Sequence, residues 1–234
     1  MAVYWIIKII SLFSYAITIP LIGYTRAWTA KKMGDDTPEQ LGFLTLDPIA
    51  HYSWIWIAFM IIFSDRVPFG FGQYIPLYIH NFRKPYRSAK LILAYFSDAI
   101  ASFVLALMAL LLFVGMYGVR SDVLIQSFIY VAVTGSYNIF AASFSSWSIL
   151  FSLWLANFVL FNITLAVFSF GFNIFYLCYF SFINKDTYFG QYSDWIMLVG
   201  PLLFLLFFSN YLYNIFLLNI TWLANVFGLL LGVR

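Results

Sequence analysis

The chain has 234 residues, of which 64% are hydrophobic and only 9% carry a charge, and its mean hydropathy is +0.91. Soluble domains carry about 25% charged residues, so this composition excludes a soluble globular protein and indicates an integral membrane protein in contact with lipids. The net charge of +3 comes without a long basic run, which argues against nucleic-acid binding. The single cysteine, Cys178, excludes an intrachain disulfide.

The first apolar segment, residues 3–31, is long enough to cross a bilayer, because about 20 helical residues span about 30 Å of hydrocarbon. Lys8 and the apolar run after it are not followed by a small-x-small cleavage site, so we expect a retained helix rather than a signal peptide. Pro20 is the expected site of a kink. Residues 23–32 are less apolar and are expected to lie at or near a membrane face.

A polar connection over residues 32–48 leads to a second apolar segment, residues 49–64, which is short for a full crossing. Pro48 stands where a first-turn proline is favoured. Residues 67–79 are rich in glycine, proline and aromatic side chains, which predicts an extended or re-entrant segment. Such backbone is tolerated at membrane depth only where protein or a water-filled cavity surrounds it.

A basic cluster follows, composed of Arg83, Lys84, Arg87 and Lys90. Its simplest interpretation is a juxtamembrane cluster that faces the cytoplasm. The alternative is a patch that binds lipid headgroups or a protein partner.

Further apolar segments follow, and the tract of residues 123–184 is almost uncharged. Residues 91–117 predict a spanning helix, and residues 123–184 suffice for two crossings and a broken third element, with divisions near 143–148 and 171–173. A last apolar stretch, residues 195–231, predicts one bent helix or two short ones. We therefore expect an all-α polytopic membrane protein with about six transmembrane helices and no separate soluble domain.

One family motif is recognisable at the end of the first segment, where residues 22–28 read I-G-Y-T-R-A-W. Further motifs follow at G-D-D-T (34–37), L-T-L-D-P-I-A-H (44–51), F-G-F-G-Q-Y-I-P (69–76), N-F-R-K-P (81–85) and N-I-T-L-A-V-F-S (162–169). In this order and spacing they resemble the compact form of the site-2 protease family, intramembrane zinc metalloproteases without a PDZ domain. The resemblance implies a single integral membrane domain over residues 1–234 with a site-2-protease-like core at about residues 15–182.

The reactive positions of that family are lost in this chain. Its H-E-x-x-H places two zinc ligands and a general base at Ile22, Arg26 and Gly23, and the third ligand falls near Leu177. Isoleucine and leucine offer no lone pair, arginine is donor-only and permanently charged, and glycine cannot activate water. The resemblance therefore implies no metal, no cofactor and no proteolytic activity.

The chain holds few residues that could replace these ligands. Its only histidines are His51 and His80, its only glutamate is Glu39, and its only cysteine lies in an apolar run. A relocated metal site from the two histidines and an aspartate stays open as an alternative. His51 matches a family histidine outside the zinc motif, for which a structural hydrogen bond is the simpler expectation.

Arg26 raises the question of what replaced the metal. A structural ion pair with Asp98, or with Asp47 from the adjoining loop, is one hypothesis, because ionisable residues inside membrane spans are costly and often functional. Under the alternative, Arg26 extends toward the interface and Asp98 faces a polar cavity. Arg26→Met discriminates between them, since unchanged stability contradicts the pair.

The sequence thus favours a catalytically inactive accessory, assembly or structural subunit of a larger membrane complex. The apolar tract of residues 123–182, with Asn157 and Asn162, is a candidate surface for partner helices. Alternatives are a protein that binds membrane clients without cutting them, an active metalloprotease with a relocated site, and a small transporter that uses Asp98. A bacterial inner membrane is the expected location, and an organelle membrane is the alternative.

Overall fold

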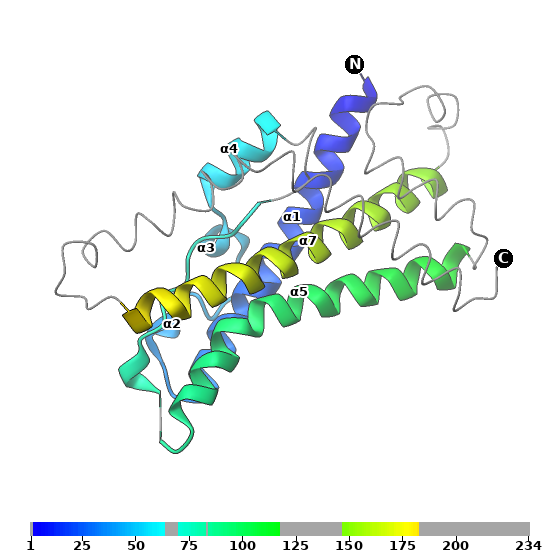
Figure 1. Cartoon of the computed structure of the whole chain (residues 1–234). Coiled ribbons are helices and arrows are strands. Elements are labelled where there is room, and N and C mark those ends of the chain that lie inside the picture. The colour runs from blue at the N-terminus through cyan, green and yellow to red at the C-terminus, as the bar shows by residue number, and fades with distance from the viewer. Residues whose placement is uncertain (1, 64–69, 83, 118–146, 183–234) are drawn as a thin grey trace.

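The computed structural model describes residues 2–63, 70–82, 84–117 and 147–182, and all the regular structure within them is helical (Figure 1). The helices are α1 (Ala2–Met33), α2 (Thr37–Gln40), α3 (Pro48–His51), α4 (Trp54–Phe63), the short 3-10 helix η1 (Ile79–Asn81), α5 (Arg87–Tyr117) and α7 (Trp147–Phe182). The expectation of an all-α chain is confirmed for this part of the molecule.

Three helices are long and apolar enough to cross a membrane, over Lys8–Met33, Arg87–Met116 and Leu150–Leu177. They belong to α1, α5 and α7, so the chain is an integral membrane protein with at least three such helices. The additional spans expected within residues 123–146 and 195–231 lie outside the described residues.

α1 continues through Pro20 and ends where its last turn meets a glycine. Gly34 has a φ of 111°, a conformation that costs glycine little, and its amide donates to the Ala30 carbonyl at 3.0 Å. The amide of Asp35 donates to the same carbonyl at 3.0 Å. Ala27 and Ala30 are fully buried, and their small side chains let neighbouring elements approach this end of α1 closely.

The segment after α1 is held by the carboxylate of Asp35, which is completely buried. It accepts hydrogen bonds from the Thr37 amide and hydroxyl at 3.1 and 2.6 Å, from the Tyr78 amide at 2.8 Å and from Asn81 Nδ2 at 3.0 Å. These contacts join the loop after α1 to η1, more than 40 residues later in the chain. Because a carboxylate is acceptor-only, four donors satisfy a charge that would otherwise be costly to bury.

The second apolar segment forms two short helices. Asp47 caps α3 by accepting from the Ile49 amide at 3.0 Å, and Pro48 occupies the first turn as expected. α4 has 10 residues, so its length is about 15 Å against about 30 Å of hydrocarbon. Within the described residues this segment is too short to cross, as predicted.

Residues 70–78 have no regular structure, in agreement with the expected extended segment. The amide of Gln73 donates to the His51 carbonyl at 2.7 Å, which ties this segment to the end of α3. Gly72 lies against Ile19 of α1, where an added Cβ would stand 2.7 Å from a side-chain carbon. The segment is therefore pressed between α1 and α3, in the protein-lined setting that irregular backbone requires in a membrane protein.

The predicted break at residues 171–173 is wrong, because α7 runs unbroken from Trp147 to Phe182. A single glycine inside a long helix lowers helix propensity by only about 1 kcal/mol relative to alanine, which packing easily offsets. Asn173 is 2% exposed and binds a side chain of α5, so its polarity serves a contact between helices rather than a turn.

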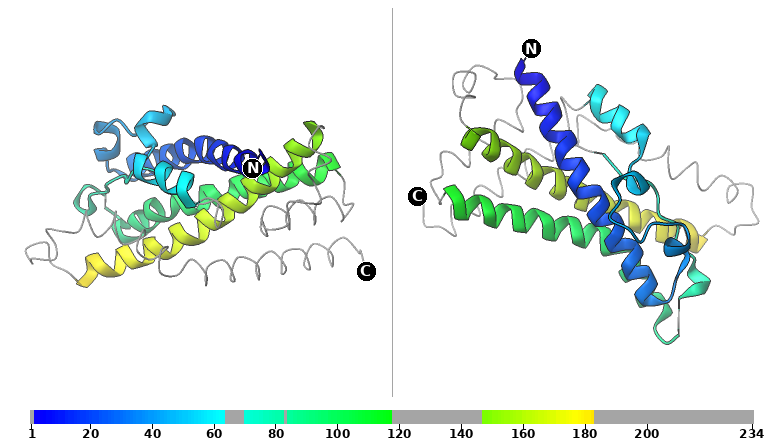
Figure 2. Two further views of the ribbon diagram at one scale, coloured as in Figure 1. Left: turned by 90° about the horizontal axis from the view of Figure 1, so that it is seen from above. Right: turned by 180° about the vertical axis from the view of Figure 1, so that it is seen from behind.

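α5 and α7 run alongside each other, and α1 packs against both (Figure 2). One apolar cluster joins α5 to the first half of α7, around Phe113, Leu153 and Leu160, which are at most 2% exposed. A second cluster lies near the end of α1, where Phe82 and Tyr95 pack with Tyr176 of α7. Between these clusters the three helices enclose polar side chains.

Candidate functional site

A cavity of about 160 Å³ lies where α1, α5 and α7 meet the segment of residues 70–78. Its polar lining comes from Arg26, His51, Asp98 and Asn173, and from Ser53, Gln73 and Ser169. Its apolar walls include Ile19, Ile22, Trp56, Phe71, Phe172 and Tyr176.

The positions that the family resemblance assigns to metal chemistry lie at this cavity, with one exception. Ile22, Gly23 and Arg26 all line it from α1. Leu177 does not, and it packs instead against the apolar cluster around Phe82. Arg26 is four residues after Ile22 and three after Gly23, and helix positions at these intervals are neighbours on the helix surface.

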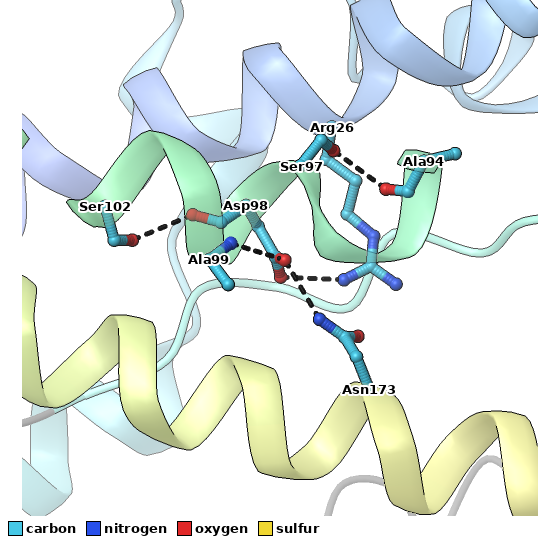
Figure 3. A network of polar contacts seen from close by, with 7 residues as sticks. All are labelled: Arg26, Ala94, Ser97, Asp98, Ala99, Ser102 and Asn173. Atoms are coloured by element: carbon cyan, nitrogen blue, oxygen red, sulfur yellow. Dashed lines mark hydrogen bonds and ion pairs between the residues drawn. The ribbon is translucent and has the colours of Figure 1, made fainter. Parts of the chain in front are cut away.

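Arg26 and Asp98 form a buried ion pair. Arg26 Nη1 is 2.9 Å from Asp98 Oδ2, and the two side chains are 10% and 12% exposed. The other oxygen of Asp98 accepts from Asn173 Nδ2 at 3.0 Å and from the Ala99 amide at 2.7 Å (Figure 3). The cluster therefore connects α1, α5 and α7 through a single carboxylate.

The second carboxylate considered for Arg26 has a different role. Asp47 is exposed and caps α3. Of the two candidate partners, Asp98 is the one that the structure places beside Arg26. A carboxylate that already caps a helix and faces outward would have to give up that contact to reach α1.

The guanidinium of Arg26 is only partly satisfied. Its Cζ lies 5.2 Å from the ring centre of Tyr95, a favourable cation–π distance. Nε and Nη2 are buried and have no hydrogen-bond partner among the described residues. Figure 3 shows one terminal nitrogen directed at Asp98 and the other directed away from it.

His51 is 1% exposed and makes the structural hydrogen bond that we expected for it. Its Nε2 lies 2.7 Å from the carbonyl oxygen of Thr45, so Nε2 carries the proton and Nδ1 is left as an acceptor. Nδ1 has no partner within the described part of the chain. The ring lies against Gly23, where an added Cβ would stand only 2.8 Å from His51 Cε1.

These residues do not fit a zinc ion. Among the described residues, no group of three His, Cys, Asp or Glu side chains is close enough to hold a metal. At the position to which the resemblance assigns a zinc ligand stands Arg26, a permanent cation whose neighbouring carboxylate is already engaged, and a cation of this kind repels Zn²⁺. His80 is exposed in η1 and does not line the cavity.

The described residues of the basic cluster, Lys84, Arg87 and Lys90, lie just before α5 and in its first turn, and none of them lines the cavity. Lys84 is exposed, and Arg87 donates through Nε to the Phe82 carbonyl at 3.1 Å and through Nη2 to the His80 carbonyl at 3.4 Å. Arg87 therefore has a local structural role, and Lys90 is half-buried on α5. Arg83 lies outside the described residues.

Sequence reasoning missed Asn173 as a partner of Asp98. A signal was present, because Asn162, Ser169 and Asn173 are separated by intervals of seven and four and so share one helical face. It also placed the polar side chains of α7 on a surface for partner helices. Asn157 and Asn162 are instead fully buried and bind α1.

Comparison with protein-family models, curated proteins and solved structures finds no match to this chain. The resemblance to site-2 proteases thus rests on the sequence motifs and their spacing.

Proposed function

We propose that the protein is a catalytically inactive, site-2-protease-like membrane protein that serves as an accessory or assembly subunit of a larger membrane complex. The observation that carries the proposal is the Arg26–Asp98 pair, which stands where the resemblance places a zinc ligand. The pair joins α1 to α5, and Asn173 extends the connection to α7. A cross-link between helices is a structural role, and it needs no metal.

The contact between Gly23 and His51 also supports an inactive protein. The resemblance assigns a general base to position 23, yet a side chain there would overlap the His51 ring. His51 in turn is fixed by its bond to Thr45 and by the Gln73 amide on its carbonyl. A glutamate at position 23 would require this corner of the fold to rearrange, so the loss of the base is accommodated by packing.

One surface of the described residues that is open to partners is apolar. The outward face of α5 exposes large side chains along most of its length, including Ile100, Phe103, Met108 and Leu111. Asn157 and Asn162 bind α1, and a partner helix that packs on this face of α5 meets apolar side chains, which favours shape complementarity over polar recognition.

The test is the composition of the particle in which the protein resides. Gentle detergent extraction followed by native mass measurement should recover it with a fixed set of other subunits in constant ratio. A second membrane protein that has a similar hydropathy and carries the same affinity tag, extracted in parallel, controls for chance co-extraction. Recovery as a lone monomer across several mild detergents contradicts the accessory role, and stoichiometric zinc by elemental analysis contradicts the loss of catalysis.

Binding of membrane clients without cleavage is a second candidate, because the cavity remains where the resemblance places the active site. A photo-crosslinking residue in place of Gln73, which lines the cavity, should then capture a membrane segment in cells. The same residue in place of Lys84, which is exposed and outside the cavity, is the matched control. Equal amounts of crosslinked product from positions 73 and 84 argue against a client site in the cavity.

A further inference from the structure

The free edge of Arg26 is the least explained feature of the cavity. Nη1 binds Asp98, whereas Nε and Nη2 are buried and without a partner among the residues that the structure describes. Nε–H and the Nη2–H beside it form one side of the planar guanidinium. This side is a two-pronged donor whose geometry matches the two oxygens of a carboxyl group.

An unused acceptor belongs to His51, another residue that lines the same cavity. His51 Nδ1 is buried without a donor in the described part of the chain, while Nε2 is committed to Thr45. The His51 ring touches the Cβ position of Gly23, which is three residues before Arg26 on α1. The Cβ atoms of residues three apart on a helix are about 5–6 Å from each other. His51 Nδ1, whose ring contacts Gly23, therefore lies about one helical turn from the Cβ of Arg26.

The charges restrict which group satisfies both side chains. Arg26 is already balanced by Asp98, and a further uncompensated charge is costly in a buried site. A carboxylic acid that arrives with its proton adds no net charge. Its two oxygens accept from the Arg26 edge, and its proton is donated to His51 Nδ1. A phosphate dianion brings excess charge, and an alcohol lacks the second oxygen.

The apolar walls and the volume of the cavity indicate what the rest of the ligand is. Ile19, Ile22, Phe71 and Phe172 offer an apolar environment to a small hydrocarbon body. The cavity volume of about 160 Å³ is comparable to that of an engineered cavity of about 150 Å³ that binds benzene. A benzoic acid, or the head end of a longer acid whose tail leaves the cavity, is therefore of suitable size.

We propose that this cavity binds a monocarboxylic acid with an apolar body, held by the free edge of Arg26 and by His51 Nδ1. The same chemistry is found in small acids from the aqueous phase and in the headgroups of bilayer fatty acids. The site is independent of the proposed role as a complex subunit, so a failure of one leaves the other standing.

The experiment uses the full chain in lipid nanodiscs, with binding measured by saturation-transfer NMR and calorimetry. The probes are benzoate, laurate and methyl benzoate, which keeps both oxygens but has no acid proton. We expect saturable binding at one site for benzoate or laurate, and binding of the ester that is weaker by roughly tenfold or more. Benzoate alone identifies a water-borne source, and laurate alone identifies the bilayer.

Two variants test the assignment to Arg26. Arg26→Lys keeps a cation opposite Asp98 and removes the two-pronged edge, so it should weaken binding of the acid by roughly tenfold or more. Lys32→Gln, on the exposed side of the same helix, should leave binding unchanged. If Arg26→Lys does not fold, the comparison of acid binding with ester binding by the natural chain still tests the proposal.

Three results overturn the proposal. The first is no saturable binding of either acid at millimolar concentrations. The second is equal binding of benzoate and its methyl ester, and the third is equal binding by the natural chain and folded Arg26→Lys. In each case water fills the polar part of the cavity, and the unpaired nitrogens of Arg26 and His51 serve only to order that water.

Discussion

α1 meets α7 through two polar regions of different character. Toward the start of the helix, the contacts are neutral: Asn157 Nδ2 donates to Ser11 Oγ at 3.1 Å, Ser14 Oγ donates to Asn157 Oδ1 at 2.9 Å, and Asn162 Nδ2 donates to Thr18 Oγ1 at 3.0 Å. Toward its end, the contact is ionic and passes from Arg26 through Asp98 of α5 to Asn173. We call these the neutral ladder and the charged cluster.

The two regions differ in what surrounds them. None of the ladder residues lines the cavity, and small hydroxyls and amides bring the two helices close together. The charged cluster lies at the cavity and leaves donors of Arg26 unused. Packing of α1 on α7 explains the ladder, although Asn162 Oδ1 in it is also buried without a partner among the described residues. The cluster contains more hydrogen-bonding capacity than packing requires, which is why we place binding there.

Removal of one charge should have the largest effect. Asp98→Leu leaves Arg26 buried without its partner and should lower the free energy of unfolding by about 3–5 kcal/mol. Arg26→Met should destabilise in the same way. The free energy is measured in bicelles by steric trapping.

The double variant Arg26→Met/Asp98→Leu separates charge from packing. It should recover most of the lost stability, because a buried pair and its apolar replacement often differ little. A fully stable Arg26→Met, or a double variant no better than either single one, contradicts the pairing as a structural contact.

An added methyl group at Gly23 tests the packing of the cluster region without any change of charge. Gly23→Ala overlaps the His51 ring and should cost about 1–3 kcal/mol, as overpacking does in other cores. Gly115→Ala on α5 is the matched control, because an added Cβ there meets nothing within 4 Å. The control should be neutral or slightly stabilising, since alanine is the better helix former.

Equal effects of the two glycine substitutions would show that His51 moves aside freely. In that case the cavity is more adaptable than its contacts indicate, and the position no longer argues against a side chain at residue 23.

The neutral ladder should respond weakly. A double-mutant cycle on Ser14→Ala and Asn157→Ala should give a coupling of about 0.6 kcal/mol, with about 1.7 kcal/mol as the upper limit for such contacts in a membrane protein. A coupling as large as that of the charged cluster would remove the distinction between the two regions.

The smallest effect is expected outside the helix interfaces. Lys31 Nζ lies 2.5 Å from Glu39 Oε1, but the two side chains are 41% and 40% exposed. Glu39→Gln should change the free energy of unfolding by less than about 1 kcal/mol, and added salt should diminish the difference further. A larger loss would mean that the loop after α1 depends on this pair rather than on Asp35.

Much of the fold could be predicted because its signals are local. Composition excluded a soluble domain, the length of the apolar runs located α1 and α5, and Pro48 located the start of α3. The shortness of α4 followed from a count of residues against the thickness of a bilayer. The break predicted near Gly171 failed because packing of α7 on its neighbours outweighs the low helix propensity of one glycine.

The candidate site was only partly predictable. The face formed by Ile22, Gly23 and Arg26 follows from helical spacing, and it does line the cavity. Asn173 could have been found from its spacing to Asn162 and Ser169 on the same helix. The buried lone pair of His51 could not, since it depends on which ring nitrogen meets the Thr45 carbonyl.

The sequence by itself determined that this is a helical membrane protein, that Arg26 stands in its first long helix, and that few residues could hold a metal. Only the tertiary structure decided that Arg26 pairs with Asp98, that Asn157 and Asn162 face α1, and that the His51 ring closes on Gly23. The physical reason is that hydropathy and propensity act over a few residues. The pairing of the buried Arg26 charge depends on Asp98, a residue 72 positions away in the sequence, and the two meet only when the helices pack.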